Sequence, residues 1–585
     1  MKRAASVFVF FTAATWVLCY PLSTSPGEVL LDPGPDARLY LWTLAWDVHA
    51  AFRSPLHVFD ANIFFPETKT LAYSEHLLAS ALLAAPWIRV SGNPILGMNV
   101  VLLLSCIVCG VGAYFLARTL GASVTGALAS GIVFAFAPPR FFRLAQVHLA
   151  AVGWMPLCLA FLHRYARGGS RRDALAAAAF FSLQALSGGY TGLFLTVTGC
   201  GLAGYLALTG EFRPRSQPLR DLAIAGSLAI ALNVSFLLPY YEVRRDLGLT
   251  RTLAEAEAFS PNAPSFLAAP THVQERLLPR RFMRRASGFL FPGFVTIGLA
   301  VFALRRREPL PPASTERTSP PREPGPSLLD GAILTCFARL LSRAKREAES
   351  RVGLHSAFYA GLAVFSLWAA LGPRFGLYGL AFRLVPGFDF IRVPARLTIL
   401  TLLALAVLAA AGVDRVKNRV LRAGLLLALV LEFAAAPLDT TRYHVPSSTL
   451  DAWLARQPGD FGVVNLPVAD PRDGVRAAQL HSLYMLQSLA HFKHLVNGYS
   501  GFTPPAHDAL FRKLVSFPNE ESLDVLEAWG VRYALLHRSL YAEREWQALS
   551  GKLETYRDRL ELVWEDGDGR VYALTRSRTR ANRKK

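Results

Sequence analysis

The chain has 585 residues, of which 52% are hydrophobic, and a formal net charge of +20. Soluble domains contain about 45–50% apolar residues, so this composition favours a membrane protein. The positive charges lie in short clusters between apolar runs, for example at 164–173, 305–308 and 414–419. This is the pattern of cytoplasmic loops under the positive-inside rule, and it argues against nucleic acid as the partner.

The apolar runs predict a polytopic helical membrane protein. A bilayer core of about 30 Å requires roughly 17–25 apolar residues in a helix. Residues 1–20 resemble a signal peptide but lack a clear cleavage site, so we interpret them as an uncleaved first span. The predicted spans, about eleven, are 5–21, 95–117, 123–138, 146–163, 173–188, 189–209, 221–240, 288–304, 354–371, 396–413 and 420–436.

Segment 76–90 is ambiguous, because it is short and contains Pro86. If it crosses the membrane, the arginines of 164–172 fall outside. If it lies on the outer surface, almost every Arg/Lys cluster falls inside, as the positive-inside rule requires. The second topology predicts a cytoplasmic N terminus, a large first outer loop over 22–94, a basic and Pro-rich cytoplasmic loop over 305–352, and an extracytoplasmic C terminus.

The chain therefore divides into a transmembrane domain, 1–436, and a small extracytoplasmic α/β domain, 437–585. In the cytoplasmic loop, the stretch 328–350 reads as a basic amphipathic helix on the inner leaflet. In the C-terminal domain, hydrophobic spacing predicts helices at 475–491, 505–516 and 520–529, and strands at 461–468, 494–498, 531–537, 560–566 and 570–576. The C-terminal domain contains no phosphate-binding loop or nucleophile motif, which favours a recognition or lid role.

Ionisable groups are nearly absent from the middle of the predicted spans, where each costs about 2.5–3.5 kcal/mol on insertion. They gather at the outer ends instead, which indicates a site at the outer membrane surface. The candidates are Asp36, Asp47, His49, Glu75, His76, Arg140, Arg143, His148, Tyr190, Arg392 and Arg396.

A site on that side has no supply of nucleotide-activated substrates, so a lipid-linked substrate is expected. Arginines such as Arg392, Arg396, Arg140 and Arg143 suit its phosphate, because the planar guanidinium binds phosphate bidentately. An inverting glycosyl transfer also requires a general base for the incoming hydroxyl, and Asp36 is the carboxylate that we expect in this role.

Three stretches resemble the GT-C superfamily of integral-membrane glycosyltransferases: LDPGPDARLYLWTLAWDVHAAF (31–52), ANIFFPETKTLAYSEHLL (61–78) and FAPPRFFRLAQVHLAAVGWMPL (136–157). They look like a bacterial branch with an extracytoplasmic C-terminal domain, to which NGYSGFTPP (497–505) and GVRYALLH (530–537) also fit. The resemblance implies a multi-pass protein of the bacterial inner membrane. It also implies transfer from a polyprenyl-phosphate sugar to a glycan, lipid or protein acceptor, with Asp36 at the position of the catalytic acid.

The resemblance leaves metal dependence open. The superfamily often has paired acids at this place, whereas PGP separates Asp32 from Asp36 in this chain. A divalent ion such as Mg²⁺ or Mn²⁺ would have Asp36, Glu75 and His76 as its candidate ligands.

Structural roles compete with these assignments. Asp36 could cap a helix formed by RLYLWTLAWDVHAAF, which would lie flat in the membrane interface with Trp42 and Trp46 as anchors. Arg140 and Arg143 could reach lipid headgroups, and His148 and Tyr190 could be interfacial packing residues. Two other functions also stay open: a non-catalytic membrane scaffold with an outer recognition domain, and a lipid or glycan flippase, which predicts polar midplane groups and inverted repeats.

Overall fold

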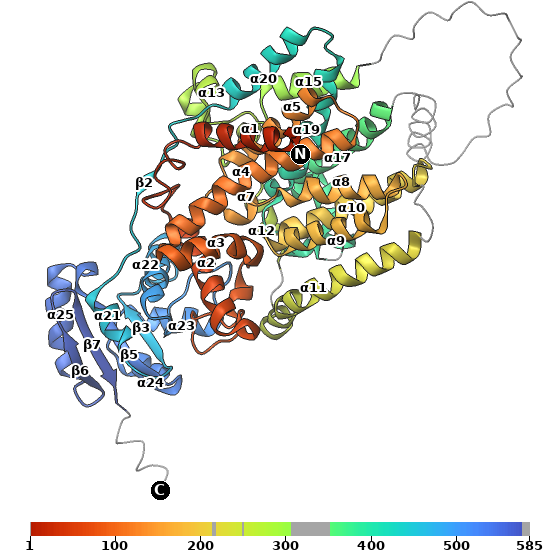
Figure 1. Ribbon diagram of the computed structural model, residues 1–585. Coiled ribbons are helices and arrows are strands. Elements are labelled where there is room, and N and C mark those ends of the chain that lie inside the picture. The colour runs from red at the N-terminus through yellow and green to blue at the C-terminus, as the bar shows by residue number, and fades with distance from the viewer. Residues whose placement is uncertain (1, 213–217, 249–250, 306–350, 386, 576–585) are drawn as a thin grey trace, which may run out of the picture.

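The structure is a computed structural model that describes residues 2–212, 218–248, 251–305, 351–385 and 387–575. Figure 1 shows a bundle of helices and, apart from it, a smaller unit built on a β-sheet near the C terminus, with α2 (Pro35–Arg53) and α3 (Leu78–Ser91) between them. The amphipathic helix expected at 328–350 lies outside the described residues.

The helices of the bundle follow the predicted apolar runs. Among the described residues, six are long and apolar enough to cross a membrane: Pro94–Thr119, Val124–Phe141, Val147–Ala166, Gly189–Leu208, Arg220–Leu247 and Pro394–Arg415. They contain α4 (Pro94–Thr119), α5 (Val124–Phe136), α6 (Pro138–Phe141), α7 (Val147–Ala150), α8 (Trp154–Ala166), α10 (Gly189–Leu208), most of α11 (Pro218–Leu247) and α19 (Thr398–Arg415).

The other five predicted spans coincide with helices that fall short of this test. These are α1 (Lys2–Leu18), α9 (Arg171–Ala185), α15 (Phe294–Leu304), α17 (Arg351–Ala370) and α20 (Arg419–Phe433). With 11 residues, α15 is about 16 Å long, roughly half of a bilayer core. It begins only after Pro292 and Gly293, because a positive φ at Gly293 breaks the helix there. The count of about eleven spans therefore stays a prediction.

The first outer loop is largely ordered into helices, and α2 does not lie flat at an interface as expected. Trp42 is 1% exposed, and the indole N–H of Trp46 donates to the carbonyl of Val58 at 2.8 Å. α2 packs against α3, α4 and α22 (Gly474–Gln487), so it is buried on most of its circumference. A helix with apolar residues on nearly all sides is stable only when it is enclosed in this way.

Helix α3 has 14 residues and is about 21 Å long, which is less than the thickness of a bilayer core. Its side chains Leu82, Trp87 and Val90 are exposed. Its place on the membrane surface, which the arginine distribution predicts, stays a prediction.

Residues 437–575, called here the C-terminal unit, form a five-stranded sheet in the order β4-β3-β5-β7-β6. β3 (Gly462–Leu466) runs parallel to β4 (His494–Leu495) and β5 (Val531–His537), whereas β7 (Gly569–Leu574) is antiparallel to β5 and to β6 (Leu560–Glu565). Around the sheet lie α21 (Thr449–Ala455), α22, α23 (Pro505–Leu514), α24 (Glu520–Ala528) and α25 (Glu543–Glu554). β3 is buried throughout, as is usual for a parallel strand with neighbours on both sides.

The first outer loop is hydrogen-bonded to the edge of this sheet. The amide of Phe65 donates to the carbonyl of Leu495 at 2.8 Å, the amide of Leu495 donates to Asn62 at 2.9 Å, and the amide of Phe64 donates to Asn497 at 3.2 Å. Residues 62–65 therefore cover the edge strand β4. A second link is the antiparallel pairing of β1 (Val29–Leu30) with β2 (Thr441–Arg442).

The basic clusters mark one end of the bundle. Arg167 donates to the carbonyl of Thr119 at 2.8 Å, and the amide of Ser123 donates to Asp414 at 2.7 Å. The C-terminal ends of α4, α8 and α19 therefore meet there, at the clusters predicted to be cytoplasmic. The start of α4 contacts the first outer loop, where Asn93 donates to the carbonyl of Gly27 at 2.9 Å. The C-terminal unit is thus joined to the opposite end of the bundle.

Candidate functional site

Asp36 is an exposed residue in the first turn of α2. Pro35 opens the helix, because its fixed φ suits the first helical position, and Gly34 is the N-cap without any side-chain bond. Asp36 is therefore not the capping residue of this helix. Its Oδ1 accepts a hydrogen bond of 2.7 Å from the hydroxyl of Tyr499, which comes from the C-terminal unit.

The two late arginines precede α19 and contact different neighbours. The guanidinium of Arg396, in η6 (Pro394–Leu397), lies 4.5 Å from the ring centroid of Tyr190 at the start of α10. That of Arg392 lies 4.7 Å from the ring of Phe259 and 4.0 Å from a carboxylate oxygen of Glu255, in α12 (Leu253–Ala258). Both cations therefore lie where the outer segments approach the bundle.

Glu75 binds the N terminus of α10 and not that of α3. Its carboxylate accepts the amide hydrogens of Gly189 at 2.5 Å and Tyr190 at 3.4 Å. A carboxylate is stabilised at this position by the unpaired amides and the dipole of the helix. Burial raises the pKa of Glu75, while the positive charge of Arg396 and the two amide hydrogen bonds oppose that rise.

Electrostatic interactions join these groups into one site. Burial raises the pKa of Tyr40, the charge of Arg396 lowers it, and the carboxylates of Asp36 and Glu75 raise it further. Burial also raises the pKa of Tyr499, with the hydrogen bond to Asp36 adding to the rise and Arg392 opposing it. The pKa of each of these tyrosines is thus influenced by one of the two arginines and by the carboxylate of Asp36.

Arg143 and His148 complete the site. Burial lowers the pKa of Arg143 to about 10, and the nearby charge of Arg396 contributes. His148 is fully buried with its ring 5.0 Å from that of Tyr40, and neither ring nitrogen has a hydrogen-bond partner among the described residues. Among the described residues, no carboxylate forms a direct ion pair with Arg143 or Arg396, although the charge of Glu75 acts on Arg396.

Arg140, expected at the site, is instead a buried structural residue. Its guanidinium donates to the carbonyl of Ala135 at 2.6 Å, to that of Ala150 at 2.8 Å and to the hydroxyl of Ser105 at 2.7 Å. The side chain has no exposed surface to offer a ligand. The backbone carbonyls that α5 and α7 leave unpaired at their ends explain why an arginine is stable there.

His76 and Asp47 are also enclosed. His76 lies 2.8 Å from the hydroxyl of Tyr240 through Nδ1, and burial lowers its pKa to about 4, so the ring is neutral. Asp47 accepts the amide hydrogen of Leu77 at 3.2 Å, and burial raises its pKa to about 8. His49 stacks on Phe492 with ring centroids 3.6 Å apart. These three side chains support the outer loop and do not face the site.

The expected metal ligands do not form a binding set. The carboxylate of Glu75 accepts hydrogen bonds from two amides, and His76 is hydrogen-bonded to a tyrosine. Asp36 accepts a hydrogen bond from Tyr499. Within the described ranges, no group of three or more His, Cys, Asp or Glu side chains is arranged to hold a metal ion. The residues present therefore do not fit a divalent ion at this place.

Sequence reasoning missed Tyr499 and Tyr40. Tyr499 contacts a residue 463 positions away in the chain, and no local pattern reveals such a pairing. The sequence signal for Tyr499 is the pair of glycines that flank it in NGYSG (497–501). Glycine allows the backbone to approach its neighbours closely, and Gly498 packs on the ring of Phe64. Tyr40 lies one helical turn after Asp36, on the same face of α2.

No family model and no curated protein matches the chain. Among solved structures, the arabinofuranosyltransferase AftD from Mycobacteria superposes with a TM-score of 0.59 at 14% identity, covering 98% of this chain and 40% of AftD. Its R1389S mutant gives 0.55. ArnT from Cupriavidus metallidurans bound to undecaprenyl phosphate gives 0.45 at 13% identity, covering 98% of both chains.

The chain thus shares the fold of AftD over nearly its whole length. Six of its described helices are long and apolar enough to cross a membrane, as a multi-pass membrane protein requires. The chain spans about two fifths of the AftD chain.

Proposed function

We propose that the protein transfers a sugar from a polyprenyl-phosphate donor to a hydroxyl of a glycan, lipid or protein acceptor. The reaction takes place on the extracytoplasmic side of the bacterial inner membrane. The observation that carries this proposal is a chain of contacts that starts from the exposed carboxylate of Asp36. Asp36 lies one turn before Tyr40 on α2, and the ring of Tyr40 lies 5.0 Å from that of His148. His148 adjoins Gly188 at the start of α10, where Tyr190 contacts Arg396.

In this reaction Asp36 is the general base. Its carboxylate takes the proton of the acceptor hydroxyl while the acceptor oxygen attacks the anomeric carbon of the sugar. The bond between that carbon and the phosphate oxygen breaks, the electron pair stays on the phosphate, and the configuration inverts. Oδ1 of Asp36 is bonded to Tyr499, so Oδ2 is the oxygen that receives the proton.

Arg143 and Arg396 stabilise the negative charge that develops on the departing polyprenyl phosphate. Both are held in a partly buried environment, where a cation interacts with phosphate more strongly than in water. Arg396 is positioned by the ring of Tyr190, and Arg392 is paired with Glu255. We assign no step to a divalent ion, because the donor set does not fit one.

The fold likeness to AftD supports a sugar-transfer reaction by analogy, since function depends on the site more than on the fold. AftD is by name an arabinofuranosyltransferase. A pentose is therefore the first sugar to test on this chain, and hexoses are the next.

The test is a transfer assay on purified full-length protein with labelled polyprenyl-phosphate pentoses and hexoses and an extract of cell-envelope acceptors. We expect Asp36→Asn to transfer sugar about 10²–10⁴-fold more slowly, because general base catalysis contributes that much. Asp32→Asn is the matched control, since Asp32 is an exposed acid in the same loop. Equal rates for wild type and Asp36→Asn would refute the general base and favour a scaffold.

A further inference from the structure

Tyr499 is a residue of the C-terminal unit that contacts the candidate general base. Its hydroxyl donates to Oδ1 of Asp36 at 2.7 Å, and its side chain is half-buried. We infer that Tyr499 is a positioning residue whose hydrogen bond fixes the carboxylate of Asp36 and directs its free oxygen toward the acceptor. This inference rests on the proposed function for the role of Asp36, but the contact itself is independent of any reaction.

The direction of the hydrogen bond follows from the ionisation of the two groups. Burial and the hydrogen bond to Asp36 raise the pKa of Tyr499, so the phenol keeps its proton at neutral pH and is the donor. A hydrogen bond donated to a carboxylate stabilises its charged form. Arg392 is close enough to oppose the shift at Tyr499, and it adds positive charge on the same side.

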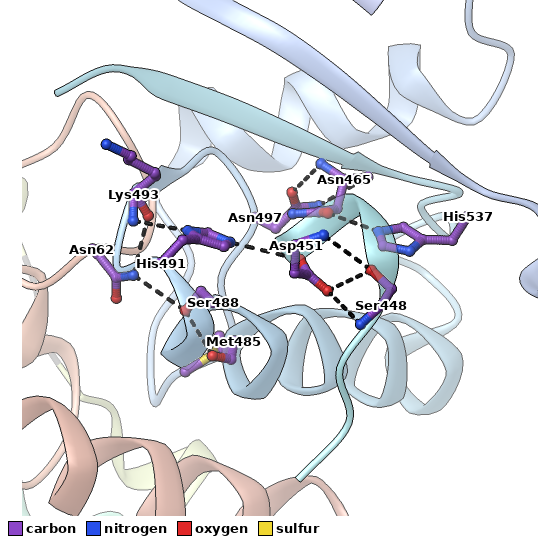
Figure 2. A network of polar contacts seen from close by, with 10 residues as sticks. All are labelled: Asn62, Ser448, Asp451, Asn465, Met485, Ser488, His491, Lys493, Asn497 and His537. Atoms are coloured by element: carbon purple, nitrogen blue, oxygen red, sulfur yellow. Dashed lines mark hydrogen bonds and ion pairs between the residues drawn. The ribbon is translucent and has the colours of Figure 1, made fainter. Parts of the chain in front are cut away.

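The backbone before Tyr499 is fixed inside the C-terminal unit. The side chain of Asn497 accepts the amide hydrogen of Asn465 at 2.7 Å and donates to the carbonyl of the same residue at 3.0 Å. His537 lies 2.8 Å from Oδ1 of Asn465 and extends this set of contacts to β5 (Figure 2). These three side chains are buried, so the strand that leads to Tyr499 is rigidly attached to the centre of the sheet.

A second set of contacts holds the start of the same strand. Nδ1 of His491 accepts the amide hydrogen of Lys493 at 2.9 Å, and Nε2 lies 3.6 Å from Asp451 of α21 (Figure 2). From the first outer loop, Asn62 donates to the carbonyl of Lys493 at 3.1 Å. The segment 493–499 is therefore held by the sheet on one side and by the outer loop on the other.

Several charged or titratable groups lie near Asp36 or act on its tyrosine neighbours. Tyr499 is the one within hydrogen-bonding distance among the described residues. The other groups are not hydrogen-bonded to Asp36, and removal of the Tyr499 hydroxyl leaves them unchanged. The groups are Tyr499, Tyr40, Glu75, Arg38, Arg392 and Arg396.

The test compares Tyr499→Phe with wild type as full-length protein in lipid nanodiscs. A water-soluble carbodiimide labels protonated carboxyls, so the labelling of Asp36 against pH, followed by peptide mass spectrometry, gives the midpoint of its titration. We expect this midpoint to rise by about one pH unit in Tyr499→Phe, because one hydrogen bond to the charged form is lost. In the transfer assay, the acid limb of kcat/KM moves up by the same amount.

Tyr484→Phe is the matched control. It removes a hydroxyl that donates to Pro467 at 2.7 Å in the same unit and that has no contact with Asp36. A midpoint raised in Tyr499→Phe alone supports the inference, and a midpoint equal in all three proteins overturns it. If the midpoint moves but wild type transfers no sugar from any donor, the contact stands and the proposed function fails.

Discussion

At the scale of single residues, two carboxylates of similar sequence context differ in their burial. Asp36 and Asp47 lie 11 positions apart on α2. Asp36 is exposed and bonded to a tyrosine, whereas Asp47 is fully buried with one oxygen on the amide of Leu77 and the other without a partner among the described residues. Burial raises the pKa of Asp47 to about 8, so this acid holds a proton at neutral pH, which is testable.

The first prediction concerns the pH dependence of stability. The pKa of Asp47 is about 8 in the folded protein against an ordinary value of 3.8, so between these values the folded state holds a proton that the unfolded state has lost. The free energy of unfolding therefore falls as the pH rises through this window. From pH 5 to pH 8 the contribution of Asp47 falls by on the order of 4 kcal/mol.

Replacement of Asp47 by Asn removes this titration. We expect the apparent Tm of wild type to decrease more steeply between pH 5 and pH 8 than that of Asp47→Asn, as measured by scanning fluorimetry in detergent. Asp439→Asn, at an exposed acid, should keep the slope of wild type. Parallel slopes for wild type and Asp47→Asn would contradict the burial of a protonated Asp47.

At the scale of elements, the N terminus of α10 is where the bundle and the outer loop meet. Gly188 precedes the helix, and a Cβ at this position would lie 3.1 Å from Cβ of His148 and 3.5 Å from Oε2 of Glu75. The helix, the histidine and the carboxylate thus approach one another only because the side chain is missing. Tyr190, which contacts Arg396, follows two residues later.

We expect Gly188→Ala to displace the start of α10 by a few tenths of an ångström and, with it, Tyr190 and Arg396. Because misplacement of groups that bind the donor reduces the rate steeply, kcat/KM for the donor should fall about tenfold or more. Gly204→Ala is the control on the same helix, where the new methyl group meets open space. If both variants transfer sugar at the wild-type rate, α10 does not position the site.

At the same scale, part of the architecture was predictable from local patterns. The five strands of the C-terminal unit fall in the stretches with strand spacing, and each predicted span coincides with a helix. The prediction that α2 lies in the membrane interface was wrong, because Trp42 and Trp46 are buried in protein. The sequence does not distinguish a tryptophan covered by lipid from one covered by protein. The length of α15 was overestimated, since apolar residues precede Gly293, whose positive φ sets the start of the helix.

The site was predictable in the same limited way. Glu75 contacts the amide of Tyr190, and the ring of Tyr190 contacts Arg396, whereas the role of these residues and of Asp36 and Arg392 in a site stays a prediction. Arg140 and Arg143 are three residues apart in PPRFFR, and only packing decides which of them is buried and fully bonded. Tyr499 depends on contacts across the whole chain, which no single stretch encodes.

At the scale of the whole molecule, the C-terminal unit is attached through main-chain hydrogen bonds between β4 and residues 62–65 and through tight packing of glycine against aromatic rings. A Cβ at Gly498 would lie 2.7 Å from the ring of Phe64, which is fully buried. Gly498→Ala should therefore loosen the attachment. We expect faster release of the C-terminal unit by limited proteolysis and a loss of transfer activity.

Gly551→Ala in α25 is the control, because its methyl group meets no neighbour. The double variant Gly498→Ala with Phe64→Leu should restore part of the resistance to proteolysis, since the smaller side chain makes room for the methyl group. Equal proteolysis of Gly498→Ala and wild type would show that this packing does not hold the C-terminal unit in place.

The covering of β4 by residues 62–65 has a consequence for biosynthesis. The ribosome releases residues 62–65 long before β4, so in the proposed topology these residues wait outside the membrane until more than 400 further residues have been made. A truncated chain that ends before Tyr499 can insert all of its long apolar helices, but Asp36 then lacks the hydroxyl group that donates to it. Nonsense mutations late in the reading frame should therefore yield an inserted but inert protein.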